Sequence, residues 1–386
     1  MQISRRKFIA ATAVVAAVPS RMLQAQTAAD VGPNILNATD KAGTSLPIVG
    51  QGEFTFELTD SWGELPDTHR WGNTHNAVQD SAGNFYIHHT ANQMNSSHDA
   101  VVVLDNKGKF VRSWGREMRG VAHGLWLRKE GNTEFLYLTQ QALSNSNAGQ
   151  PPPEIYAAVV KATLDGEIVW TLKGPPEIPE YSTPINGRLP NYNPTNVAFA
   201  PNGDMFVADG YGHYYINQYD SRRNHVRSFG GRAPGQNPFS YGAPVSTGVD
   251  GPMGTLAEPH GIWVDDRTAN PMLWVADRRN FRVQRFTLDG QPVDKIVQPW
   301  GADRGLPSHF HSRNGFVVVG ELQGRVTILD PENKPVVRLG NPPGARGAPP
   351  APGSLRPGHG AIFDHEGNIL LCTYTGNRVT RFRKVS

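Results

Sequence analysis

One short unit recurs six times along this chain, and this repeat limits the folds that the sequence can adopt. Each copy opens with a polar residue and continues with a short apolar strand, a turn that contains glycine and a second apolar strand. Four of the five spacings between the lead residues lie between 48 and 65 residues, and the longer spacing of 72 contains a proline-rich insert at 141–193. Such a period indicates one structural unit per copy. The lead residues are His75, His123, Thr195, His260, Ser308 and His359.

The second half of each unit holds two further strands. In the first copy, apolar segments at 101–104 and 110–114 flank an Asp-x-x-Gly turn at 105–108. Four short strands joined by such turns form one antiparallel blade, and six blades around an axis form a propeller. The sequence therefore predicts an all-β, six-bladed β-propeller over residues 54–386, with no internal domain boundary.

A lone strand precedes the first repeat, and it predicts how the ring closes. Phe54–Trp62 has a strand pattern, whereas the last repeat ends at Phe382, close to the C-terminus. Pairing of these two segments would cover two exposed sheet edges at once. We therefore expect the N-terminal strand to complete the last blade.

The N-terminal region is expected to be an export signal rather than part of the propeller. Ser4-Arg5-Arg6-Lys7-Phe8 is typical of a twin-arginine signal, and the apolar run Ile9–Val18 is too short to anchor the chain in a membrane. We assign residues 1–28 to the signal peptide and 29–53 to an N-terminal segment, which predicts a periplasmic or secreted protein without a membrane anchor after cleavage. The alternative is an ordinary basic start before a core helix.

Charge and cysteine content exclude several classes of function. The chain has 37 basic and 34 acidic side chains; removal of residues 1–26, which carry four basic and no acidic ones, leaves 33 against 34, or about −1. Such a surface does not attract nucleic acid in bulk. The single cysteine, Cys372, excludes internal disulfides and thiolate clusters, and its apolar surroundings favour a buried position. We expect a monomer that binds a small-molecule or peptide substrate.

The lead residues carry the predicted chemistry. The first strand of each propeller blade lines the central channel, so His75, His123, His260 and His359 should face one axis. Converging imidazoles suit a divalent metal, of which zinc is the commonest in such sites. The alternative is that these histidines only bind water and loop backbone and hold the blades together.

Two segments carry a resemblance to a known family. Residues 193–211 contain Asn-Pro-Thr-Asn-Val and Val-Ala-Asp-Gly-Tyr, and residues 259–286 contain Pro-His-Gly-Ile-Trp-Val and Val-Ala-Asp-Arg-Arg-Asn-Phe-Arg. They resemble the peptidyl-α-hydroxyglycine α-amidating lyases, which are six-bladed propellers of NHL-type repeats. The leads at 122–125 and 358–361 match the same family in two further blades.

The resemblance implies a zinc enzyme. It implies that His123, His260 and His359 bind the zinc ion, that Tyr211 is the catalytic base and that Arg278 assists it. The implied reaction breaks the N–C bond of a carbinolamide and yields an amide and glyoxylate.

The chain departs from the family at several positions. His89 and Thr90 stand near the place of a family arginine, Pro357 replaces a methionine, and Gly360 replaces a carboxylate that would serve a structural calcium ion. The resemblance therefore leaves calcium and the natural substrate open. His75, His88 and His89 are expected to surround the metal ligands or to bind the substrate.

The sequence is also consistent with two other classes of protein. The chain could be another propeller enzyme, such as a lactonase or a streptogramin-type lyase, or an NHL propeller that binds a partner without catalysis. Asp209 and Asp277 end strands in Val-Ala-Asp motifs, and we expect their carboxylates to accept hydrogen bonds from turns rather than to act in catalysis.

Overall fold

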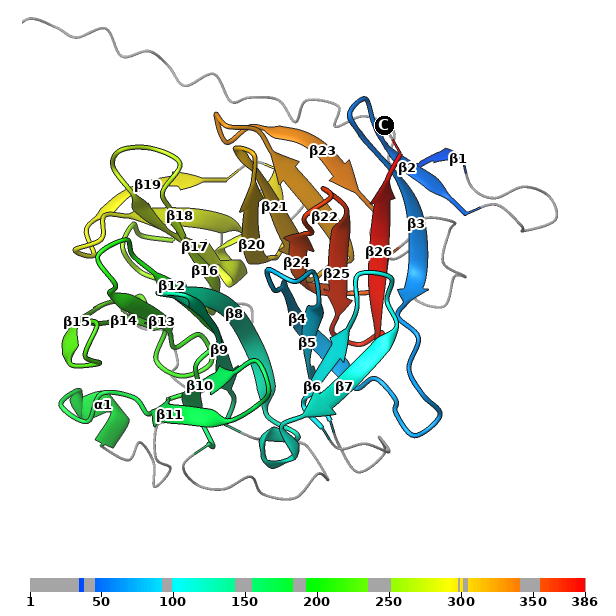
Figure 1. Cartoon of the computed structure of the whole chain (residues 1–386). Helices are drawn as coiled ribbons and strands as arrows, with labels where there is room; N and C mark the ends of the chain where they lie inside the picture. Colours follow the sequence, from blue (N-terminus) through cyan, green and yellow to red (C-terminus); the bar gives the residue numbers. More distant parts are fainter. Residues whose placement is uncertain are drawn as a thin grey trace, which may run out of the picture.

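The computed structural model describes the strand residues 35–37 and the ranges 46–91, 99–142, 155–182, 192–234, 251–297, 299–300, 305–340 and 355–385. Within these residues, six antiparallel sheets surround a central axis (Figure 1). This arrangement confirms the predicted all-β, six-bladed β-propeller. The predicted signal peptide at 1–28 and most of the segment at 29–53 lie outside the described residues.

Each of the first five blades is one consecutive four-stranded antiparallel sheet. Blade 1 consists of β4 (Asn73–Gln79), β5 (Phe85–Thr90), β6 (Val101–Leu104) and β7 (Phe110–Trp114). Blade 2 consists of β8 (Ala122–Glu130), β9 (Thr133–Gln140), β10 (Ala158–Thr163) and β11 (Ile168–Leu172). Blade 3 consists of β12 (Asn196–Phe199), β13 (Met205–Ala208), β14 (Tyr215–Tyr219) and β15 (His225–Gly230).

The remaining blades follow the same order around the ring. Blade 4 consists of β16 (Pro259–Asp265), β17 (Met272–Asp277), β18 (Arg282–Phe286) and β19 (Pro292–Ile296). Blade 5 consists of β20 (Pro307–Arg313), β21 (Phe316–Glu321), β22 (Arg325–Leu329) and β23 (Pro335–Leu339). Blade 6 begins with β24 (Gly358–Phe363), β25 (Ile369–Thr373) and β26 (Arg378–Lys384).

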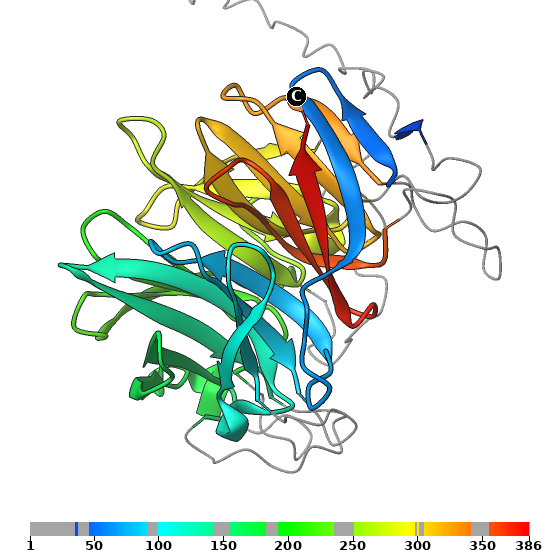
Figure 2. The ribbon, with the colours of Figure 1, turned by 45° about the vertical axis from the view of Figure 1, so that its right-hand side comes forward.

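The first and last parts of the propeller close the ring by pairing. Strand β3 (Phe54–Trp62) runs antiparallel to β26, with Val379 opposite Trp62 and Phe382 opposite Leu58. The turned view shows β3 beside β26, with β2 (Ile48–Gln51) on the outer side of β3 (Figure 2). The predicted closure of the last blade by the N-terminal strand is thus confirmed.

Apolar packing between neighbouring blades holds the ring together. Each of six buried hydrophobic clusters joins two adjacent blades; one of them packs Ile87 of blade 1 against Cys372 of blade 6. Cys372 has no exposed surface, as predicted, and its burial raises the pKa of the thiol. Because the blades pack face to face around a closed circle, their first strands are held rigidly at the axis.

The helical elements whose bounds lie within the described residues are single turns. They are η1 (Arg116–Met118), α1 (Pro179–Ser182) and η2 (Arg278–Asn280). No helix among the described residues is long and apolar enough to cross a membrane.

Candidate functional site

Four lead histidines meet on the propeller axis. His75, His123, His260 and His359 come from the first strands of blades 1, 2, 4 and 6, and each is at most 4% exposed. The rings of His123, His260 and His359 form a nearly equilateral triangle, with centroids 4.5 to 4.6 Å apart. His75 lies beside this triangle, 4.8 Å from the ring of His359 and 5.3 Å from that of His123.

A β-bulge turns each of the three triangular histidines toward the axis. The pairing of β8 with β9 skips from Ala122 to Leu125, and β16 and β24 skip two residues at the same place in their blades. The skipped residues are the His-Gly dipeptides at 123–124, 260–261 and 359–360. Bulges re-aim side chains in this way near functional sites.

The neighbouring blade fixes the orientation of each of these imidazoles. Nδ1 of His123 donates a hydrogen bond to the carbonyl of Thr195 at 2.6 Å, and Nδ1 of His260 donates to the carbonyl of Ser308 at 2.6 Å. Nδ1 of His359 donates to the carbonyl of His75 at 2.8 Å. Because a carbonyl can only accept, Nδ1 carries the proton in all three rings and Nε2 presents a lone pair.

The glycine of each His-Gly pair allows this contact. A Cβ atom at Gly124 would lie 2.5 Å from the carbonyl oxygen of Thr195, and a Cβ atom at Gly261 would lie 2.6 Å from that of Ser308. Only glycine lets two backbones approach so closely. The dipeptide therefore provides both the ligand and the space for the carbonyl that orients it.

Burial keeps the axial histidines neutral. Burial is the largest cause that lowers the pKa of His123, His260 and His359 well below the ordinary value, and the positive charge of Arg278 lowers all three further. Nε2 of His359 lies 3.1 Å from Nε2 of His123. Two lone pairs that face each other repel unless a cation lies between them.

The donor set therefore fits a metal ion. Two imidazole nitrogens on one tetrahedral zinc ion lie about 3.3 Å apart, which is close to the distance between these two Nε2 atoms. The ligand atoms of His75, His123 and His359 all lie within 4.8 Å of one another, so these three buried histidines could also hold a metal. We favour His123, His260 and His359, because among the four axial histidines these three share the Nδ1-to-carbonyl contact that orients a metal-bound imidazole.

Tyr211 lies beside the histidines, on the loop that follows β13. Its hydroxyl is 3.2 Å from Nε2 of His123 and 3.1 Å from Nε2 of His260. Nη2 of Arg278, at the start of η2, donates to the same hydroxyl at 3.2 Å. The structure thus brings together four of the five residues that the resemblance assigned to catalysis and metal binding, and the fifth, His359, contacts His123.

A buried ion pair holds Arg278. Glu258, which is 1% exposed, accepts hydrogen bonds from Nη2 of Arg278 at 2.8 Å and from Nε of Arg279 at 2.9 Å. Burial opposes its ionisation, but the two guanidinium groups keep the pKa of Glu258 below its ordinary value. Although burial also disfavours the charged guanidinium, Tyr211 and Glu258 raise the pKa of Arg278. Glu258 has a φ of 53°, in the left-handed region that a residue with a side chain rarely adopts.

The remaining predicted histidines lie in the wall of blade 1. Nε2 of His75 is 2.7 Å from the hydroxyl of Thr90. His88 donates from Nδ1 to the carbonyl of Gly124 at 3.1 Å, and Nδ1 of His89 accepts from the amide of Gly72 at 3.0 Å. Burial lowers the pKa of His88 to about 3 and that of His89 to about 4. Both side chains support the lead strands, and their contact with a substrate stays a prediction.

The calcium ion that the resemblance implies does not fit here. Gly360 offers no carboxylate, and the side chain of Asn76 fills the adjacent space; a Cβ atom at Gly360 would lie 2.4 Å from Oδ1 of Asn76. Nδ2 of Asn76 donates to the carbonyl of Leu125 at 3.1 Å. An amide group thus bridges blades 1, 2 and 6 where a carboxylate would be needed to hold the cation.

The two Val-Ala-Asp carboxylates accept hydrogen bonds from neighbouring loops, as predicted. Asp209 accepts from the amides of Asn193 and His213 at 2.7 and 2.6 Å. Asp277 accepts from the amide of Ala257 at 2.7 Å and from Nε of Arg282 at 2.7 Å. Both carboxylates therefore hold the loops that carry Tyr211 and Arg278.

Two residues at the site escaped the sequence reasoning. One is Glu258, which directly precedes the Pro-His lead of blade 4. An acidic residue at that position was the sequence signal that could have indicated a partner for Arg278. Tyr374 follows β25 and is 38% exposed, with its ring 6.3 Å from that of His359 and 5.9 Å from that of His75. Blades 3 and 6 are opposite in the ring, so Tyr211 and Tyr374 face the axis from opposite blades.

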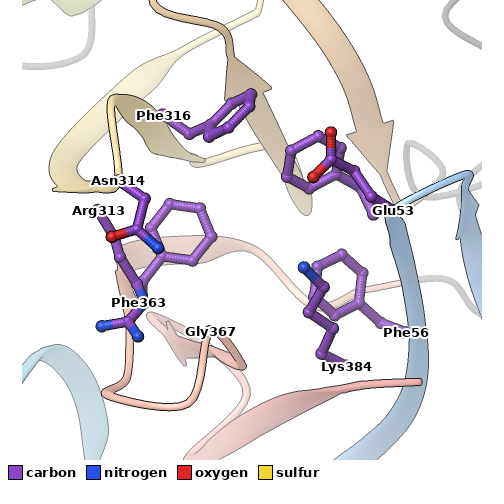
Figure 3. Close-up of a pocket in the computed structure, with 9 residues that line it drawn as sticks. Glu53, Phe56, Arg313, Asn314, Phe316, Phe363, Gly367 and Lys384 are labelled. Carbon is purple, nitrogen blue, oxygen red and sulfur yellow. The ribbon is translucent and has the colours of Figure 1, made fainter. Parts of the chain in front are cut away.

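A separate hollow lies between blades 5 and 6, at the ends of β20 and β24 that are remote from the lead residues (Figure 3). Phe54 and Phe316 meet there edge to face at 4.9 Å, and the ammonium of Lys384 lies 5.8 Å from the ring of Phe54. None of the axial histidines lines it.

Fold and site together define a class: a six-bladed β-propeller with a buried histidine centre on its axis and a tyrosine–arginine pair beside it. The chain is similar to peptidyl-alpha-hydroxyglycine alpha-amidating lyase 1 of Drosophila melanogaster, with 32% identity over 254 residues. The alignment covers 58% of this chain and 41% of the relative, so the chain spans less than half of that protein's length. No family model matches the sequence.

Solved structures align with the chain at low sequence identity. A structural genomics protein of unknown function from Bacteroides thetaiotaomicron aligns with a TM-score of 0.52 and 10% identity, covering 87% of this chain and 79% of that one. Virginiamycin B lyase from Staphylococcus aureus aligns with a TM-score of 0.49 and 12% identity, covering 86% of this chain and 100% of that one. The Bacteroides structure supports the fold alone.

Proposed function

We propose that this protein is a zinc-dependent carbon–nitrogen lyase that cleaves an α-hydroxyglycine-type carbinolamide to an amide and glyoxylate or a related aldehyde. The observation that carries the proposal is the hydroxyl of Tyr211, which lies within 3.2 Å of two histidine Nε2 atoms and of a buried guanidinium. Similarity to an amidating lyase supports the same reaction class.

The three axial histidines are the proposed metal ligands. His123, His260 and His359 form a triangle of neutral rings 4.5 to 4.6 Å apart, and the carbonyls of neighbouring blades accept from Nδ1 and leave Nε2 with a lone pair. A zinc ion held there supplies a Lewis acid beside the phenol of Tyr211. Calcium is not part of the proposal, because Asn76 and Gly360 do not form a site for it.

Tyr211 performs the proton transfers. Its phenolate takes the proton of the substrate hydroxyl, and the electrons of that O–H bond form the carbonyl of the departing aldehyde. The N–C bond breaks, its electron pair moves to nitrogen, and the tyrosine returns the proton to that nitrogen. No oxidant or reductant is needed, and the tyrosine ends in the state in which it began.

Arg278 stabilises the ionised form of Tyr211. A free tyrosine has a pKa near 10, so an ionised Tyr211 needs nearby positive charge. Nη2 of Arg278 donates to the phenol oxygen at 3.2 Å from a buried position that is 5% exposed. A charge-assisted hydrogen bond in such surroundings is stronger than one in water.

The proposal includes the cellular setting. The twin-arginine segment within residues 1–28 directs the protein to the periplasm or the exterior, and the mature protein works there as a monomer on a small-molecule or peptide substrate.

A glyoxylate assay tests the reaction. Purified protein should release glyoxylate from hydroxyglycine peptides or N-acyl-hydroxyglycines, or the corresponding aldehyde from related carbinolamides. Tyr211→Phe should retain metal and fold but lose roughly 10²–10⁴-fold in turnover, the size of a general-base contribution. Arg278→Lys should retain part of the activity, because a point charge cannot replace the planar guanidinium. If zinc-loaded protein cleaves no carbinolamide, the lyase proposal is wrong and the fold and histidine centre alone stand.

A further inference from the structure

The guanidinium of Arg278 is already engaged on one side. Its Nη2 atom donates to Glu258 at 2.8 Å and to the hydroxyl of Tyr211 at 3.2 Å. Nη2 carries two N–H groups, so these two bonds use its full donor capacity. Nε of Arg278, by contrast, is buried and makes no hydrogen bond within the described part of the chain.

This arrangement removes both forks with which an arginine recognises a carboxylate. A bidentate pair needs two parallel N–H groups, either from Nε and Nη2 or from Nη1 and Nη2. Both pairs include Nη2, whose two donors Glu258 and Tyr211 occupy. The N–H groups that Arg278 can still offer, on Nε and Nη1, do not form a parallel pair, so each can make only a single hydrogen bond, which suits a neutral carbonyl oxygen.

The blade opposite Arg278 also offers groups that form only single hydrogen bonds. Blade 1 lies opposite blade 4, and there the hydroxyl of Thr90 lies 2.7 Å from Nε2 of His75. A hydroxyl and an imidazole form single hydrogen bonds with neutral oxygen or nitrogen atoms and do not provide the planar two-point contact of a guanidinium.

From these contacts we infer that Glu258 is a specificity-determining residue: by occupying Nη2 of Arg278 it makes the site select an uncharged carbinolamide derivative over one that carries a carboxylate. The inference rests on the proposed function for the identity of the substrate class. It predicts that the best substrate has an amide or another neutral acceptor where hydroxyglycine has its carboxylate, so that the aldehyde released is a neutral glyoxylate derivative.

Binding of two stable probes tests this without turnover. N-acetylglycine carries a carboxylate and N-acetylglycinamide carries a neutral amide at the same place. Calorimetry with the protein as purified should show wild type preferring N-acetylglycinamide. Glu258→Leu frees one N–H of Nη2 and restores a fork, so its relative affinity for N-acetylglycine should rise by tenfold or more.

Two further variants separate specificity from folding. Glu258→Gln keeps an acceptor for Nη2 but removes the negative charge, and it should shift the preference in the same direction by a smaller factor. Glu321→Gln is the matched control, because Glu321 forms another buried pair, with Arg338 at 2.5 Å, that does not contact Tyr211. It should lower stability similarly and leave the preference unchanged.

The outcomes distinguish this inference from the proposed reaction. A wild type that prefers N-acetylglycine, or Glu258 variants that fold but bind the two probes in the wild-type ratio, would overturn the role of Glu258. A shifted ratio in a protein that cleaves no carbinolamide would instead leave the role of Glu258 standing and refute the lyase.

Discussion

The Nε2 atoms of His123 and His359 lie 3.1 Å apart at the propeller axis. Both rings donate from Nδ1 to a backbone carbonyl, so both Nε2 atoms point lone pairs into the same space. Such a contact is repulsive in an empty site and favourable around a cation. This relationship is the strongest structural reason to expect a metal.

The first prediction concerns the ligand set. His123→Ala, His260→Ala and His359→Ala should each lose most of the bound zinc, whereas His75→Ala should retain most of it, because His75 makes no Nδ1-to-carbonyl contact of the same kind. Elemental analysis of the purified variants gives the answer. If His75→Ala empties the site as fully as the others, the centre has four histidine ligands and iron becomes the better assignment.

The second prediction concerns the glycine beside a ligand. Gly124→Ala should weaken metal binding at least tenfold, because its Cβ would lie 2.5 Å from the carbonyl oxygen of Thr195 and push it away from Nδ1 of His123. A zinc titration against a competing chelator measures the change. Gly251→Ala is the control, since its Cβ would meet only the side chain of Asn280 at 3.2 Å. Equal metal affinities in the two variants would contradict the orienting role of the carbonyl.

The third prediction concerns stability in acid. Burial lowers the pKa of His309, a blade 5 residue that is 3% exposed, from 6.5 to about 4. Between pH 6.5 and about 4, His309 is protonated in the unfolded chain but neutral in the folded protein. The contribution of this residue to the free energy of unfolding is therefore complete above pH 6.5 and decreases as the pH falls toward 4. The loss from this one residue is on the order of 3 kcal/mol.

Denaturant unfolding of wild type and His309→Gln at several pH values tests this. Glutamine can keep a hydrogen bond to the carbonyl of Ala361, which Nδ1 of His309 contacts at 3.2 Å, but it does not titrate. The free-energy curve of the variant should be flatter between pH 6.5 and 4. Parallel curves for the two proteins would show that His309 does not contribute.

The fourth prediction concerns export. Replacement of both Arg5 and Arg6 with lysine should leave the full-length precursor in the cytoplasm, because the transport system reads the paired arginines. Cell fractionation and immunoblotting measure how much of the protein lies inside and outside the cytoplasm. The protein with its wild-type signal segment serves as the control. Normal accumulation of the double variant outside the cytoplasm would refute the twin-arginine interpretation.

Sequence reasoning reached the fold because its signals are local. Alternating strands, Asp-x-x-Gly turns and a period of about fifty residues are all visible within one repeat, and a blade is a nearly self-contained sheet. The same local pattern located His123, His260 and His359 on first strands, which line the axis in any propeller. Tyr211 and Arg278 came from the family resemblance, and the structure brings both to the axis.

What only the tertiary structure decided lies between blades. The carbonyls of Thr195 and Ser308 that orient the histidines have no side-chain signature, so the sequence could not reveal them. The pairing of Glu258 with Arg278 depends on how a loop before β16 meets one after β17. The sequence determined which groups reach the axis, since period and turn chemistry act within a repeat. Their hydrogen-bond partners, and hence the chemistry that the site favours, depended on close packing between strands that are far apart in the chain.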